Sequence, residues 1–151
     1  MSKPLAHITQ EAARSFVVAD IRGVELAAGA TTEVDVLDIP AGASVGIIKT
    51  KLKEEFGGET AVVTALTAQV GDEDDADGFI AAKSVLDDNS PVAAAQSDGV
   101  YANSGTDSAP GVFKLYPAAK TLKVKFTKTG AGNATALFTT GRLQLTVEII
   151  A

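Results

Sequence analysis

The sequence predicts an all-β protein, a sandwich or barrel of about eight or nine short antiparallel strands. Apolar and polar residues alternate along most segments, and this period of two is typical of half-buried strands. The 14 glycines and 5 prolines lie mostly between the apolar runs, where turns are expected. The runs follow one another at a spacing of roughly ten residues, which favours a sandwich or a barrel over helical folds.

The clearest strands are expected near the C-terminus. Residues 121–127 alternate without error and place Leu122, Val124 and Phe126 on one face. Residues 142–149 repeat the pattern, with four apolar residues expected to point inward: Leu143, Leu145, Val147 and Ile149. Between them, a turn at 130–133 is followed by a short apolar piece around 136–138. We therefore expect three consecutive strands of a meander.

The upstream segments give weaker versions of the same pattern. Strands are expected at 15–21, 32–37, 44–56, 61–70, 79–86 and 111–116, and a loop at 87–110. Residues 49–56 also fit a short amphipathic helix. We favour a strand because β-branched residues open the segment and because Lys49, Lys51 and Lys53 occupy alternate positions. Ile48, Thr50 and Leu52 would then point inward.

Length predicts one domain preceded by an arm. A chain of 151 residues is long enough to bury a core without disulfides. Residues 1–14 are polar, contain Pro4 and show no clear hydrophobic face, so we expect an extended N-terminal arm that a partner surface orders. Residues 15–151 form the expected single β-sandwich domain.

Charge and composition exclude several classes of function. The net charge of −6 argues against general binding to nucleic acid or to anionic membranes. Cysteine is absent and His7 is the one histidine, so thiol chemistry and most histidine-based catalysis are unavailable. No apolar run approaches membrane-spanning length, and the N-terminus has no signal-peptide core, so synthesis in a cytosol is expected.

The two halves of the chain differ in charge. Residues 1–80 hold 6 basic and 14 acidic residues, whereas residues 81–151 hold 7 and 5. The difference could orient one copy against another or against a partner. It fits two solvated faces of different sign equally well.

Residues 42–46 spell G-x-S-x-G, the pattern of a nucleophile elbow centred on Ser44. That arrangement needs a histidine after the serine in chain order, and His7 precedes it. A turn rich in small residues explains the match, so we expect no catalysis by Ser44.

Residues 71–78 place five carboxylates in six consecutive positions, as a calcium-binding loop would. Glu73, Asp75, Asp77 and Gly78 fit the spacing of an EF-hand, but its twelfth position is Ser84 instead of a bidentate glutamate. Looser calcium binding and an acidic, solvated hairpin loop remain the two interpretations, and the second is preferred.

Other motifs are weaker. Residues 130–135 are similar to a dinucleotide-binding turn but lack a following helix, and Asn133-Ala134-Thr135 is a glycosylation sequon without a secretory context. Tyr101 and Tyr116 could stack on a sugar or a base, although burial at a sandwich edge is preferred. No catalytic, cofactor or metal site is predicted, and the protein is not expected to be an enzyme, since its clustered carboxylates should be solvated and unperturbed.

The order of turns and strands resembles a known family. Its elements are Ile39-Pro40-Ala41-Gly42 before an apolar strand, the acidic glycine loop running into Gly78-Phe79-Ile80, and a glycine at 141 before the final strand to Ile150. Over residues 39–150 this plan resembles the head decoration, or cement, proteins of tailed bacteriophages.

The resemblance implies a jelly-roll-like sandwich that binds the outer surface of a phage head, commonly as a trimer, and stabilises the shell by bridging copies of the major capsid protein. It implies no catalytic or cofactor residue. Two other functions stay open: a carbohydrate- or receptor-binding module presenting residues 87–110, and another virion part such as a tail or head-closure subunit.

Overall fold

A computed structural model describes residues 14–86, 98–99 and 114–151. These residues form nine strands and one short 3-10 helix, η1 (Gly23–Glu25). The strands are β1 (Arg14–Arg22), β2 (Thr31–Ile39), β3 (Ser44–Gly57), β4 (Ala65–Gly71), β5 (Ile80–Ser84), β6 (Asp98–Gly99), β7 (Lys114–Leu115), β8 (Lys120–Thr129) and β9 (Thr140–Ile150). None of the helical segments within these ranges is long and apolar enough to cross a membrane.

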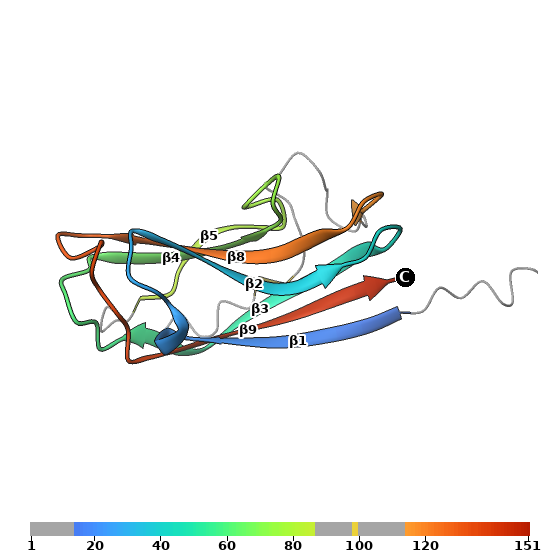
Figure 1. Cartoon of the computed structure of the whole chain (residues 1–151). Helices are drawn as coiled ribbons and strands as arrows, with labels where there is room; N and C mark the ends of the chain where they lie inside the picture. Colours follow the sequence, from blue (N-terminus) through green and yellow to red (C-terminus); the bar gives the residue numbers. More distant parts are fainter. Residues whose placement is uncertain (1–13, 87–97, 100–113) are drawn as a thin grey trace, which may run out of the picture.

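The strands form two antiparallel sheets that pack face to face (Figure 1). Sheet A has the order β1-β9-β3-β6, with β7 also paired to β3, and sheet B has the order β2-β8-β4-β5. The first strand therefore pairs with the last, and the second pairs with the last but one. This winding is the jelly roll, and it confirms the predicted all-β sandwich and its strand number.

The expected alternation of buried and exposed residues is confirmed. Leu122, Val124 and Phe126 are buried on β8, and the four inward positions of β9 are buried as well. On β3, Ile48, Thr50 and Leu52 are buried while the three lysines between and after them are exposed, so the strand interpretation of residues 44–56 is correct.

The core lies between the sheets and is continuous from end to end. Phe56 of β3 packs against Phe126 of β8 with ring centroids 5.5 Å apart, which joins the two sheets at one point. Phe138 meets the edge of the Phe56 ring at 6.3 Å. The first pair is tilted by 46°, and the second has the edge-on geometry that is favourable for aromatic pairs.

The predicted meander is wrong, because β8 belongs to sheet B and β9 to sheet A. Residues 130–139 contain no strand and cross from one sheet to the other (Figure 1). The cause is a tertiary contact: Gly130, at φ +132°, and Gly132 lie against the backbone of residues 61–64. Gly132 N–H donates to the Val62 carbonyl at 2.7 Å. Because of the same contact, β4 starts at Ala65 and not at residue 61, where the sequence pattern predicted it.

Other boundaries differ by a few residues. β1 starts at Arg14, within the range expected for the arm, and the described part of the strand expected at 111–116 is Lys114–Leu115. The rest of the arm lies outside the described residues, as does the loop expected at 87–110 apart from Asp98–Gly99, which form β6.

Candidate functional site

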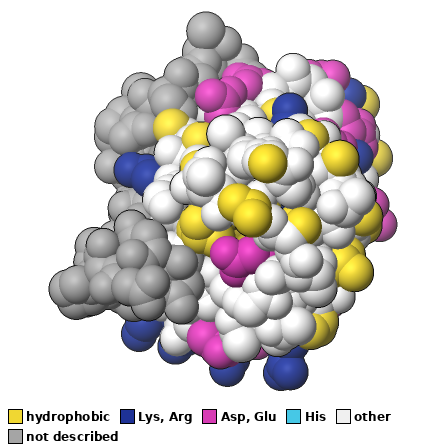
Figure 2. All heavy atoms as spheres, turned by 90° about the vertical axis from the view of Figure 1, so that its left-hand side faces the viewer, with side chains coloured by type: hydrophobic (Ala, Val, Ile, Leu, Met, Phe, Trp, Pro, Cys, Tyr) yellow, Lys and Arg dark blue, Asp and Glu magenta, His cyan; other side chains and the backbone are white. Residues whose placement is uncertain are grey.

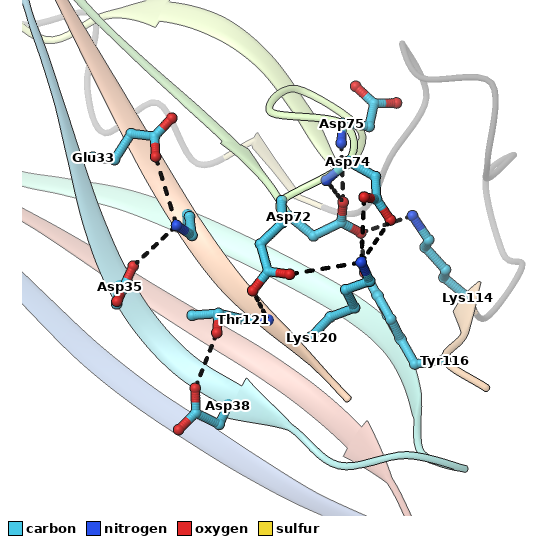
Figure 3. A network of polar contacts seen from close by, with 12 residues as sticks. Glu33, Asp35, Asp38, Asp72, Asp74, Asp75, Lys114, Tyr116, Lys120 and Thr121 are labelled. Atoms are coloured by element: carbon cyan, nitrogen blue, oxygen red, sulfur yellow. Dashed lines mark hydrogen bonds and ion pairs between the residues drawn. The ribbon is translucent and has the colours of Figure 1, made fainter. Parts of the chain in front are cut away.

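Asp72 lies at the start of the acidic loop and is buried, with its side chain 1% exposed. Lys114 Nζ donates to Oδ2 at 2.8 Å and Tyr116 OH donates to the same oxygen at 2.7 Å (Figure 3). The backbone N–H groups of Asp74 and Asp75 donate to Oδ1 at 2.9 and 3.0 Å. Four donors therefore hold one carboxylate and close the loop onto β7.

These donors change the titration of Asp72. Burial by itself would raise its pKa, because the charged form loses solvation. The hydrogen bonds from Lys114, Tyr116 and the two backbone N–H groups outweigh burial and lower the pKa to about 2. Asp72 is therefore a permanently charged structural group near neutral pH.

The exposed part of the loop is paired as well. Lys120 Nζ lies 3.0 Å from the Asp74 carboxylate and 3.6 Å from that of Glu73. Thr121 N–H donates to Glu73 at 3.1 Å, which fixes the loop to the start of β8 (Figure 3). The expected solvated, unperturbed loop is therefore wrong for Asp72, because residues more than 40 positions away in sequence supply its partners.

The other motifs occupy structural positions. Ser44 opens a strand after a turn in which Ala43 N–H donates to the Pro40 carbonyl, so the strand-to-helix turn of a nucleophile elbow is not formed. Residues 130–135 form turns. Tyr116 is buried, as preferred, and its hydroxyl is bound to Asp72. Tyr101 and His7 lie outside the described residues.

The carboxylates of residues 73–78 do not form a cluster that could hold a metal ion in this structure. Among the described residues, no three histidine, aspartate or glutamate side chains gather closely enough to hold a metal ion. Ser84, the twelfth position of the calcium pattern, is the last residue of β5.

One end of the sandwich is apolar. Val24, Val62 and Leu137 are 67%, 65% and 45% exposed, and we call them the apolar end. Figure 2 looks at this end and shows hydrophobic side chains grouped near its centre, with an acidic side chain beside them and most Lys and Arg at the margins. The adjoining segments 26–32 and 129–141 contain no charged residue, and the charged residues nearest in sequence to Val24 and Val62 are the acidic Glu25 and Glu59. Exposed apolar groups gathered in this way are typical of a docking surface.

The apolar end is held in one shape by hydrogen bonds between its segments. Thr60 N–H donates to the Leu137 carbonyl at 2.9 Å, and Leu137 N–H donates to Thr60 Oγ1 at 3.0 Å. Beneath them, Lys128 is 2% exposed and its Nζ donates to the carbonyls of Ala27 and Ala136 at 2.8 and 2.7 Å. Such a preorganised surface loses little conformational entropy on binding.

Sequence reasoning missed Lys114 and Lys128. Lys128 was detectable, because it continues the inward alternation of Leu122, Val124 and Phe126. Burial lowers the pKa of Lys128, because its charged ammonium group loses solvation. Within the described residues its hydrogen-bond partners are carbonyls, and no carboxylate offsets this effect. No local sequence pattern identifies Lys114, because its role depends on the folded chain bringing it next to Asp72.

The outer face of sheet A carries the remaining exposed apolar side chains, those of Phe16, Val18, Ile47 and Leu115. The same face carries Lys49, Lys51 and Lys53, which are exposed along β3. Repulsion from Lys51 is the main cause that lowers the pKa of Lys53. This face therefore has exposed apolar side chains around the start of β1 and exposed lysines farther along β3.

Comparison with known proteins gives one structural similarity to report. No protein-family model matches the sequence, and no curated protein matches it. A chain from the capsid asymmetric unit of cyanophage Pam1 superposes with a TM-score of 0.55 at 17% identity, covering 99% of this chain and 91% of that chain. At this identity the similarity establishes a shared fold.

Proposed function

We propose that this protein is a virion structural protein, and specifically a decoration protein on the exterior of a phage head. The observation that carries the proposal is the end-to-end similarity to a chain of a cyanophage capsid asymmetric unit. Because 99% of this chain and 91% of that chain are covered, the similarity involves the whole jelly roll rather than a shared fragment.

The distribution of surfaces supports the proposal. The apolar end offers a preorganised contact for a shell subunit. Arg14, from which the arm of residues 1–13 departs, pairs with Ile150 at the opposite end of the sandwich. A protein with contacts at both ends can bridge two neighbouring subunits, and many weak contacts on a repeating lattice reinforce one another.

We propose that the partner is the major capsid protein and that copies assemble as trimers on the shell. The arm would order against a neighbouring chain by strand addition or groove insertion. No step in this function needs catalysis, and Asp72, a carboxylate whose pKa is lowered to about 2, is held by four donors inside the fold.

Co-sedimentation with isolated heads that lack the protein tests the proposal. We expect wild-type protein to pellet with the heads, and we expect Val62→Glu combined with Leu137→Glu to reduce the bound fraction strongly. Lys83→Glu, outside the apolar end, is the control. Absence of wild-type protein from the pellet contradicts the decoration function, and equal binding of the double variant contradicts the role of the apolar end.

Deleting residues 1–13 tests the arm and leaves Arg14 and β1 intact. We expect lower occupancy on heads with an unchanged thermal transition; unchanged occupancy would end the proposal for the arm. Cryo-electron microscopy of decorated particles distinguishes a head exterior from a tail or head-closure position. Binding on a glycan array without binding to heads would favour the carbohydrate-binding module.

A further inference from the structure

β1 differs from the other sheet edges in the regularity of its pairing, although it too carries exposed charged side chains, those of Arg14, Asp20 and Arg22. Edge strands usually carry bulges, prolines, lysines or exposed charges, or are very short. β2 has a register shift after Asp35 and exposed carboxylates at Glu33 and Asp35, whereas β6 and β7 have two residues each. β5 has five residues and a register shift in its pairing with β4.

β1 is as long as β2 and longer than β5, β6 and β7, and its pairing is regular. Its nine residues pair with β9 without a register shift, and they include no proline, glycine or lysine. Within the described residues, β1 has a strand neighbour on the β9 side only. Its other side therefore presents backbone N–H and C=O groups to whatever covers it.

The outward side chains of β1 form a short symmetric pattern. Phe16 and Val18 are each 59% exposed, which is unusual for large apolar residues on an open edge. Arg14 and Asp20 flank them on the same face, with side chains 57% and 36% exposed. Within one copy, Arg14 Nε lies 3.4 Å from the Glu148 carboxylate and Asp20 lies 3.3 Å from Arg142 Nε, so a contact across the seam would add to these ion pairs. The order along the face is thus basic, apolar, apolar, acidic.

We propose that β1 pairs antiparallel with β1 of a second copy about a two-fold axis through Val17. In this register Phe16 lies opposite Val18 of the other copy, and Arg14 lies opposite Asp20. Each contact occurs twice because of the symmetry. Apolar pairs and opposite charges directly across from one another are the stabilising cross-strand pairs.

Side-chain direction and charge select this register over its neighbours. Residues that lie opposite each other in an antiparallel pair must have side chains on the same face of the sheet. The possible registers therefore differ by shifts of two residues of one strand along the other. Centring on Val18 places Arg14 opposite Arg22 and Phe16 opposite Asp20. Centring on Phe16 pairs Arg14 with Val18 and leaves Asp20 unmatched. Only the Val17 register gives all four residues from Arg14 to Asp20 on this face a complementary partner, and the fifth outward residue, Arg22, lies beyond the paired segment.

The pairing goes beyond the proposed function, because it needs no shell. On a lattice it would join β1 edges of adjacent copies across two-fold positions. A seam of about seven residues is short, so it benefits from the high effective concentration of copies held side by side.

Engineered disulfides test the register directly, because the chain contains no cysteine. Opposite residues in an antiparallel pair have Cα atoms about 4.5–5.5 Å apart, which is within disulfide range. Phe16→Cys and Val18→Cys are made as separate chains and oxidised alone or after co-expression. On co-expression we expect a covalent dimer of the two different chains. Its yield should be roughly ten times that of the covalent dimer formed by either chain oxidised alone, a factor that corresponds to about 1.4 kcal/mol.

Val24→Cys co-expressed with Val62→Cys is the matched control, because both residues are about as exposed but lie at the apolar end. Ser15→Cys with Ala19→Cys tests the same register and keeps Phe16 in place. A dimer yield no higher than the control for both pairs overturns the pairing. Dimers of Phe16→Cys alone or of Val18→Cys alone indicate the other two registers and overturn this one. These experiments contain no heads, so their failure leaves the decoration proposal intact.

Discussion

Two charged residues inside this fold, Asp72 and Lys128, are held by hydrogen bonds from both neighbouring and distant parts of the chain. Asp72 collects four donors at one end of the sandwich, and Lys128 donates to two carbonyls at the other. A buried polar group stabilises the fold only when its hydrogen bonds are made, and removing its hydrogen-bond partner is destabilising. Both residues should therefore matter for stability more than exposed residues of the same type.

The pH dependence of stability should reveal Asp72. Its folded-state pKa of about 2 lies below the ordinary value of 3.8, so the unfolded chain binds the proton more tightly. The resulting stabilisation is present above pH 3.8 and is lost as the pH falls through about 2. We expect Asp72→Asn to lower the free energy of unfolding by about 2 kcal/mol at neutral pH, with the difference shrinking in acid.

Denaturant titrations at several pH values measure this effect. Asp74→Asn is the control, because Asp74 lies in the same loop with its side chain 69% exposed and pairs with Lys120 at the surface. Exposed pairs are worth less than about 1 kcal/mol. A constant difference between wild type and Asp72→Asn from pH 7 to pH 2 would show that the charge of Asp72 is not responsible.

Lys128→Ala should destabilise the protein by about 2–4 kcal/mol, since it leaves the Ala27 and Ala136 carbonyls without their donor and opens a cavity. Lys125 lies on the same strand and points outward, so Lys125→Ala should change stability by less than about 0.5 kcal/mol. Similar unfolding free energies for the two variants, measured in urea, would contradict the role of Lys128.

At the scale of elements, the crossing from β8 to β9 decides the topology. Gly141 lies near the start of β9 and has φ +121°. A Cβ added to this residue would lie 2.5 Å from Phe56 Cγ in the core. Strand patterns on either side of this crossing are clear in the sequence. Their assignment to different sheets depends on the contact between residues 130–132 and 61–64.

Gly141→Ala should therefore destabilise the fold by several kcal/mol, combining a left-handed backbone cost of about 1–2 kcal/mol with overpacking of about 1–3 kcal/mol. Gly42→Ala provides the comparison, because Gly42 has φ +88° but nothing within 4 Å of an added Cβ. It should show the backbone cost alone. Thermal melts of the two variants measure the difference, and equal melting temperatures would exclude the clash with Phe56.

For the whole molecule, the pairing of the first strand with the last makes the fold strongly non-local. β9 also pairs with β3, so sheet A cannot form until the chain is nearly complete. Loop-closure entropy must be overcome before these contacts form, and all-β proteins of this kind fold in milliseconds to seconds. Stopped-flow refolding should give a rate in that range, and microsecond folding would contradict it.

Sequence alone determined what depends on local pattern. The period of two in residues 121–127 and 142–149 set both strands and their buried faces, and the alternation of lysines with apolar residues identified β3. The same parity places Lys128 inward. These features follow from the geometry of one strand, in which successive side chains point to opposite faces.

Tertiary structure decided which segments meet. Lys114 and Tyr116 reach Asp72 from 42 and 44 residues away, so a loop that looked solvated holds a buried carboxylate. The residue 130–132 turn packs on residues 61–64 and sends β9 to the other sheet. Exposure of Phe16 and Val18 likewise depends on β1 ending at a sheet edge. Pairing partners are set by the free energy of the closed chain, and no local period encodes them.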